Sequence, residues 1–122
     1  MYVAVGIAME RRSYILIIED DEAMREVVGD YLRLSHEDVR TVADGAEALA
    51  LLEAGDPPAC VISDVVVPGL LGTSVVDYMR ASPRLRDVRV AFMTGSPELA
   101  PDGYRVFTKP LHLRELQAFV DA

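Results

Sequence analysis

The stretch that decides the fold of this chain is Tyr14-Ile15-Leu16-Ile17-Ile18-Glu19-Asp20-Asp21. It begins with five apolar residues that show no polar alternation, which is typical of a parallel strand covered on both faces. The run then ends on three acidic residues. In an open parallel sheet, ligands bind outside the carboxyl ends of the strands, so these acids stand where a site would form.

Three later runs also end on residues that can handle a phosphoryl group. They are Ala59-Cys60-Val61-Ile62-Ser63 before Asp64, Val90-Ala91-Phe92-Met93 before Thr94, and Arg105-Val106-Phe107-Thr108 before Lys109-Pro110. Parallel strands bring their carboxyl ends to one edge of a sheet. We therefore expect acids, one hydroxyl and one amine to converge on a single crevice.

Apolar residues at helical spacing separate these runs. In chain order they are Met24, Val27, Val28, Tyr31 and Leu32; Ala48, Leu49 and Leu52; Val75, Val76 and Met79; and Leu113, Leu116 and Val120. Asp21 is placed to cap the first helix, and Asp44 with Glu47 has the spacing of a capping box. Val39 to Val42 adds a short strand. Alternating strands and helices predict an α/β fold whose parallel sheet has helices on both faces.

One segment breaks this alternation. Only 14 residues, Gly95 to Thr108, separate Thr94 from Lys109, and Pro97 and Pro101 both fall among them. Two prolines so close leave little room for a regular helix. We expect a loop or a single turn there.

Length and composition limit the function classes. The 122 residues suffice for one domain with one core, and the net charge of −8 with a pI near 4.6 argues against direct DNA binding. The single cysteine, Cys60, excludes an internal disulfide and reads as a small core residue in a reducing cytoplasm. No apolar run approaches the roughly 20 residues that span a bilayer, so no membrane association is expected.

The first 13 residues stay open to three interpretations. Residues 1–8 are apolar, but Arg11 and Arg12 follow them, which is the wrong order for a signal peptide. The segment is a disordered tail, an extra strand or packing arm, or an extension upstream of a true start at Met9. We divide the chain into this segment, 1–13, and a folded domain, 14–122.

Taken together, the motifs resemble the receiver domain of two-component response regulators, in its single-domain form within the chemotaxis-receiver-like superfamily. The motifs that carry the resemblance are 15–21, 64–72, 93–95 and 108–110. It implies a doubly wound, flavodoxin-like sheet of five parallel strands in the order 2-1-3-4-5. Against that pattern, the fourth helix is expected to be shortened or absent.

The resemblance makes Asp64 the phospho-acceptor and Mg²⁺ the cofactor. A carboxylate can accept a phosphoryl group as an acyl phosphate, and crowded carboxylates favour a bound cation. By resemblance, Asp20 binds the metal directly and Glu19 helps through water. Asp64 and the backbone carbonyl of Val66 complete the protein ligands. Read alone, Glu19-Asp20-Asp21 would be an ordinary acidic helix start.

Thr94 and Lys109 are the remaining site residues that the resemblance implies. The Thr94 hydroxyl can donate to a phosphoryl oxygen, and the Lys109 ammonium can neutralise its charge. The alternatives are a threonine that caps the following turn and a surface lysine over an apolar edge. The family usually has a cis peptide bond here, which proline allows, so we expect it at Lys109–Pro110.

The chain also departs from the family. Many receivers carry an aromatic switch residue three positions before the lysine, where this chain has Val106. The neighbouring Phe107 should point to the opposite face of the sheet. His36 and His112 invite a phosphohistidine interpretation, but their positions in a loop and at a helix start favour surface roles.

The predicted function is that of a cytoplasmic signalling module, not a turnover enzyme. It would take a phosphoryl group from a histidine kinase or a histidine phosphotransfer protein onto Asp64 and change its affinity for an unknown downstream protein. Homodimer formation stays open. The alternatives are a phosphate sink or relay, the receiver part of a hybrid kinase, and a constitutive scaffold with vestigial phosphorylation.

Overall fold

The structure is a computed structural model that describes residues 13–122, so the prediction for the first 13 residues lies outside it except for Ser13. Five strands form one parallel sheet in the order β2-β1-β3-β4-β5, as predicted. The strands are β1 (Ile15–Ile18), β2 (Val39–Val42), β3 (Cys60–Asp64), β4 (Arg89–Thr94) and β5 (Arg105–Thr108). The helices are α2 (Glu22–Arg33), α3 (Gly45–Ala54), α4 (Gly72–Ala81) and α5 (Leu113–Asp121), with one 3-10 turn, η1 (Pro97–Leu99).

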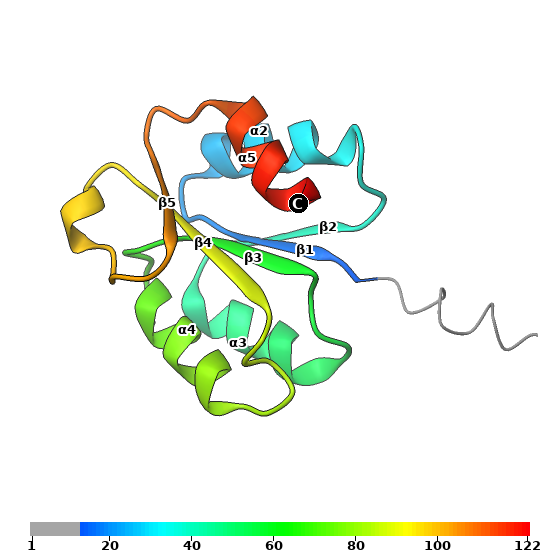
Figure 1. Cartoon of the computed structure of the whole chain (residues 1–122), viewed down its shortest axis with the longest axis vertical. Helices are drawn as coiled ribbons and strands as arrows, with labels where there is room; N and C mark the ends of the chain where they lie inside the picture. Colours follow the sequence, from blue (N-terminus) through cyan, green and yellow to red (C-terminus); the bar gives the residue numbers. More distant parts are fainter. Residues whose placement is uncertain (1–12) are drawn as a thin grey trace, which may run out of the picture.

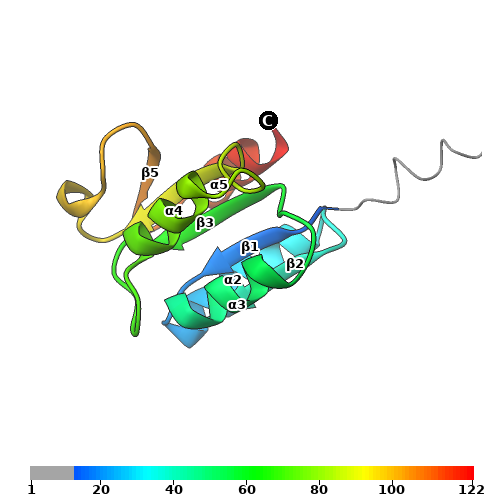
Figure 2. The ribbon, with the colours of Figure 1, turned by 90° about the horizontal axis from the view of Figure 1, so that it is seen from below.

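The helices cover the two faces of the sheet in pairs, α2 with α5 and α3 with α4 (Figures 1 and 2). Strand β1 serves both cores because its side chains alternate. Ile15 and Ile17 pack on the α2 and α5 side, whereas Leu16 and Ile18 pack on the other. All four are at most 3% exposed, which explains why the run shows no polar alternation.

The predicted helix starts are confirmed. The Asp21 side chain caps α2 by accepting a hydrogen bond from the Ala23 N–H at 3.1 Å. At α3, Asp44 accepts from the Glu47 N–H at 2.7 Å. Glu47 reaches back to the N–H of Ala43 at 3.0 Å, one residue before the cap. Both caps satisfy backbone donors that the helix itself leaves unpaired.

The segment between β4 and β5 contains only η1, which confirms the shortened fourth helix; it is the yellow turn beside β5 in Figure 1. Phe92 of β4 is nevertheless fully buried. The ring of Tyr104 packs edge-on against it at 5.4 Å between centroids. Arg80 of α4 donates from Nε to the Tyr104 hydroxyl at 3.0 Å. We call these two residues the Tyr104–Arg80 cover.

Strand β5 separates its two central side chains as alternation predicts. Phe107 is 5% exposed and packs edge-on against Phe119 of α5, with 6.0 Å between ring centroids. Val106 is half-buried on the opposite face. The position of the family's aromatic switch therefore carries a small aliphatic side chain, and the nearby ring is part of the α5 core.

The loop after β3 turns back closely on the strand that precedes it. Gly72 starts α4 with its N–H bonded to the carbonyl of Val65 at 3.0 Å. A Cβ at position 72 would lie 2.2 Å from the carbonyl oxygen of Asp64, so the close approach requires glycine. In the same loop Gly69 has φ +79°, which also favours glycine. This loop fixes the backbone directly after Asp64.

Two further properties concern the core and the surface. Cys60 is fully buried in β3, and burial raises the pKa of its thiol to about 11, as suits a core residue. No helix in residues 13–122 is long and apolar enough to cross a membrane.

Candidate functional site

The carboxyl ends of β1 and β3 bring three acids together. Glu19, Asp20 and Asp64 each offer one carboxylate oxygen within 4.8 Å of the others. The strands that deliver them are hydrogen-bonded neighbours, with Ile18 opposite Ser63 in the register. The predicted convergence of acids at one edge of the sheet is therefore present in the structure.

Lys109 joins this cluster from the end of β5. Its Nζ lies 2.9 Å from Oδ2 of Asp64 and 2.6 Å from Oε1 of Glu19. Its backbone N–H donates to the carbonyl of Thr94 at 2.9 Å, and the Lys109–Pro110 peptide bond is cis, as expected. Burial acts to lower the pKa of Lys109, but its bonds to the two carboxylates outweigh burial and raise it.

Glu19 is the most enclosed acid of the site, with 1% of its side chain exposed. Oε1 accepts from Lys109, and Oε2 accepts from the N–H of Asp21 at 3.1 Å. Burial raises the pKa of Glu19 despite the opposing effect of Lys109. Both oxygens of this carboxylate thus have protein partners.

Asp20 and Asp64 offer their carboxylates more freely. Asp20 is exposed, and its carboxylate forms no hydrogen bond with any residue in the described part of the chain. Asp64 is 14% exposed in its side chain, and its Oδ1 accepts from the N–H of Val66 at 3.4 Å, which is a long contact. Oxygen ligands of this kind suit a hard cation, so the residues present fit Mg²⁺.

Thr94 reaches the same end of the sheet but points its hydroxyl to its own loop. It is 3% exposed, and its Oγ1 accepts from the N–H of Ser96 at 3.0 Å. In this structure Thr94 therefore caps the turn that follows it, as the alternative interpretation predicted. The hydroxyl proton remains available to a group placed beside it.

Arg25 also contacts the site, and its role was not predicted from the sequence. Its Nη1 donates to the backbone carbonyl of Glu19 at 2.9 Å and to that of Asp20 at 3.3 Å. A basic residue one turn into the helix that follows the acids was the available signal. It went unused because a single arginine on an amphipathic helix normally reads as surface charge.

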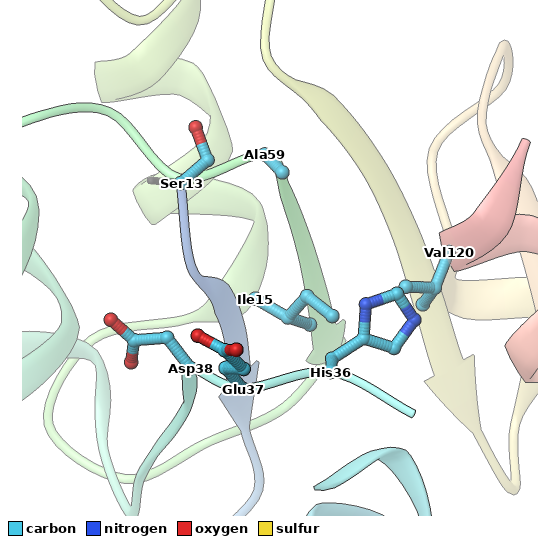
Figure 3. A pocket seen from close by; sticks show the side chains of 7 residues that line it. All are labelled: Ser13, Ile15, His36, Glu37, Asp38, Ala59 and Val120. Atoms are coloured by element: carbon cyan, nitrogen blue, oxygen red, sulfur yellow. The ribbon is translucent and has the colours of Figure 1, made fainter. Parts of the chain in front are cut away.

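A cavity of about 240 Å³ lies away from the acids, at the amino ends of β1 and β3 (Figure 3). Ser13, Ile15, His36, Glu37, Asp38, Ala59 and Val120 line it. None of the predicted site residues is among them. His36 is paired through Nε2 with Oδ1 of Asp121 at 2.8 Å, so it links the loop before β2 to the end of α5. This contact is structural, which agrees with the expected surface role of His36.

Comparison with known proteins gives a consistent result. The family model of the response regulator receiver domain matches residues 15–121. Sensory transduction protein RegX3 of Mycolicibacterium smegmatis is 33% identical over 115 residues, covering 88% of this chain and 49% of that protein. Transcriptional regulatory protein PrrA of Mycobacterium tuberculosis is 36% identical over 117 residues, with 88% and 48% covered. This chain thus spans about half the length of these relatives.

Solved structures show the same likeness. The chemotaxis response regulator CheY4 of Vibrio cholerae superposes with a TM-score of 0.79 at 26% identity, covering 89% of this chain and 96% of that one. The receiver domain of sensor histidine kinase PA1611 from Pseudomonas aeruginosa has a TM-score of 0.77 at 27% identity, with 89% and 94% covered. That structure has a magnesium ion coordinated in its active site cleft.

Proposed function

The chain belongs to the response regulator receiver domain family, and we propose on this basis that it takes a phosphoryl group onto Asp64 from a histidine kinase or a histidine phosphotransfer protein. The observation that supports Asp64 most directly is its contact with Lys109, 2.9 Å from Nζ to Oδ2, at the edge of the sheet where the acids meet. The proposed output is a change in affinity for a downstream protein. Such modules respond to a local change of charge at a bistable surface.

In the proposed transfer, a carboxylate oxygen of Asp64 attacks the phosphorus of the donor's phosphohistidine. The new P–O bond forms as the P–N bond breaks, and the bonding pair returns to the imidazole nitrogen, which leaves the acyl phosphate on Asp64. Lys109 already contacts this carboxylate and can balance part of the added charge. Thr94 is proposed to donate its hydroxyl to the phosphoryl group afterwards.

Mg²⁺ is the proposed cofactor, and it would neutralise the charge on the transferring phosphoryl oxygens. Asp20, Asp64 and the backbone carbonyl of Val66 would hold it. Within residues 13–122 the Asp20 carboxylate has no partner to give up, which favours it as a direct ligand. Glu19 is engaged by Lys109 and Asp21, which agrees with a contribution through water only.

The test is mass spectrometry of the intact protein after treatment with acetyl phosphate and Mg²⁺. The wild type should gain one phosphoryl mass and Asp64→Asn none. Asp56→Asn, which changes an exposed acid just before β3, is the matched control and should label like the wild type. Equal labelling of the Asp64 variant would reject the assignment.

A second candidate is the receiver part of a hybrid kinase or phosphorelay. It is favoured by the likeness to the PA1611 receiver domain and to the receiver domain of a histidine kinase from Syntrophus aciditrophicus, which has a TM-score of 0.77 at 27% identity. Transfer from the phosphorylated chain to a histidine phosphotransfer protein would distinguish the two candidates. A relay or sink should lose its phosphoryl group to that protein rapidly, whereas an output module should retain it.

We propose that residues 14–122 form the receiver domain, that it acts in the cytoplasm beside its kinase, and that it promotes only its own phosphorylation and dephosphorylation. A constitutive scaffold with vestigial phosphorylation would bind its partner equally well with Asp64→Asn. Analytical ultracentrifugation with and without phosphodonor would decide the open question of a homodimer.

A further inference from the structure

The loop between β1 and α2 carries the acid that we propose as the direct metal ligand, and that acid lacks side-chain support. No described residue bonds to the Asp20 carboxylate, so its direction depends on the backbone that bears it. A ligand held only by its backbone is well placed when that backbone is rigid. The question is what holds this loop.

Beside the backbone bonds from the N–H of Glu19 to the carbonyl of Val42 at 3.0 Å and from the N–H of Arg25 to the carbonyl of Asp21 at 2.9 Å, three contacts between side chain and backbone hold this loop. The N–H of Asp21 donates to Oε2 of Glu19, and the Asp21 side chain accepts from the N–H of Ala23. The third contact is the guanidinium of Arg25, which donates from Nη1 to two successive carbonyls, those of Glu19 at 2.9 Å and Asp20 at 3.3 Å.

Arg25 differs from the other two contacts in what it touches. Within residues 13–122 it is the only side chain that donates to either carbonyl, and the only one that bonds to any atom of Asp20. It is half-buried and comes from the first turns of α2, a rigid element that packs on the sheet. A planar guanidinium that binds two neighbouring carbonyls fixes the peptide between them, which a lysine ammonium does less well.

We infer that Arg25 is a positioning residue: it holds the peptide between Glu19 and Asp20 so that the Asp20 carboxylate faces Asp64 across the metal site. This inference rests on the proposed magnesium site. Arg25 is not one of the site residues that the family resemblance implied. Arg25 would not touch the metal or the phosphoryl group, and it would act through Asp20.

A purely electrostatic role of Arg25 predicts the opposite sign. A guanidinium near a divalent cation repels it, so removing the charge would tighten Mg²⁺ binding. If Arg25 instead positions Asp20, removing it weakens binding. Loss of a residue that orients a metal ligand typically costs about 10–100-fold in metal affinity. The direction of the change therefore separates the two roles.

The experiment is a Mg²⁺ titration of the full chain, followed by backbone amide NMR, with Arg25→Gln, Arg25→Lys and Arg114→Gln. Arg114 lies exposed on α5 without a described contact, so its variant controls for the lost charge. We expect Arg25→Gln to raise the Kd for Mg²⁺ at least about tenfold. Arg25→Lys should lie between that variant and the wild type, and Arg114→Gln should stay close to the wild type.

A second readout does not require the metal. In metal-free protein, Arg25→Gln should shift the amide resonances of residues 19–23 and speed hydrogen exchange at Asp21, whose N–H is bonded within this loop. Unchanged resonances and exchange in this loop would overturn the inference whether or not Mg²⁺ binds. Tighter or equal Mg²⁺ binding by Arg25→Gln would also overturn it. Failure of the wild type to bind Mg²⁺ would reject the proposed cofactor, and the loop readout would still decide the role of Arg25.

Discussion

Both carboxylate oxygens of Glu19 are held by the protein. One oxygen lies 2.6 Å from Nζ of Lys109, and the other accepts a hydrogen bond from the N–H of Asp21. The carboxylate is thereby placed where it is almost fully buried. Its raised pKa means that the folded protein holds the Glu19 proton more tightly than the unfolded chain does.

This pKa shift predicts a pH-dependent effect of Glu19→Gln. The stabilisation from protonated Glu19 is complete below the unfolded pKa, about 4.3, and is lost as the pH rises through the folded pKa. Glutamine does not titrate, so the variant should be more stable than the wild type at pH 7, and the difference should shrink toward pH 4. Urea unfolding across this range measures it, with exposed Glu115→Gln as control. A variant that is less stable at pH 7 would contradict the prediction.

We expect Thr94 to be needed for the response to phosphorylation and Val106 to contribute mainly to stability. Thr94→Ala removes the oxygen that binds the N–H of Ser96, so it should accept phosphate but fail to shift the loop behind it. Val106 is half-buried and has no ring to swing between positions. Val106→Ala should therefore cost about 1 kcal/mol of unfolding free energy and leave the phosphorylation response intact. NMR shifts of residues 95–103 after phosphodonor treatment measure the response of each variant. A response that is lost in Val106→Ala and kept in Thr94→Ala would contradict this prediction.

At the scale of elements, the Tyr104–Arg80 cover shields the side chain of Phe92 where the segment between β4 and β5 forms only the short turn η1. Phe92 stays fully buried because the Tyr104 ring lies against it and Arg80 holds that ring through its hydroxyl. The same guanidinium binds the carbonyl of Val88 at 2.9 Å, which ties the end of α4 to the start of β4. A single aromatic residue and one arginine thus close this part of the core.

The Tyr104–Arg80 cover can be tested by two substitutions. Tyr104→Phe removes only the hydroxyl and should cost about 1 kcal/mol of unfolding free energy. Tyr104→Ala uncovers Phe92 and should cost about 3 kcal/mol. Urea unfolding gives both values, and Tyr78→Phe, whose hydroxyl contacts exposed Glu53, should change stability little. Equal effects of the two Tyr104 variants would show that the ring does not protect the core.

The loop around η1 should exchange its amides quickly. Between Gly95 and Gly103 the backbone makes two hydrogen bonds within the turn, from the N–H groups of Leu99 and Ala100. The other backbone N–H groups of this segment lack the hydrogen bonds to neighbouring strands that protect β4. Hydrogen exchange of this segment should therefore be fast relative to β4. Slow exchange across the whole segment would contradict this prediction.

The sequence predicted the elements well because each carries a local signal. The unalternated run at 14–18, the cap at Asp21 and the two prolines after Ser96 each depend on neighbours in the chain, and the structure confirms all three. The convergence of the acids and Lys109 at one edge of the sheet was also predicted, because parallel strands align their carboxyl ends, and Lys109 lies 2.6 Å from Glu19. The Tyr104–Arg80 contact was not predictable, because it joins residues 24 positions apart that nothing in the local pattern pairs.

For the whole molecule, metal binding should be visible as stability. A ligand that binds only the folded state stabilises it by RT ln(1 + [L]/Kd), so Mg²⁺ at ten times its Kd should add about 1.4 kcal/mol. Asp20→Ala should abolish this gain. Thermal unfolding with Mg²⁺ and with an equal ionic strength of sodium chloride measures it. An equal gain in the Asp20 variant would locate the metal elsewhere.

The cavity at the amino ends of the strands has a consequence for the connectivity of the domain. Ser13, the first described residue, and Val120, near the last, line this cavity from opposite sides (Figure 3). A linker that spans the cavity can join these ends, and the backbone can then be opened elsewhere. Opening it between Gly95 and Gly103 would give a circular permutant in which the peptide segment no longer connects Thr94 to Lys109. Such a molecule keeps every side chain of the acidic site, so Asp64 should still accept a phosphoryl group. The movement of the loop after Thr94 should no longer reach Lys109 through the peptide chain.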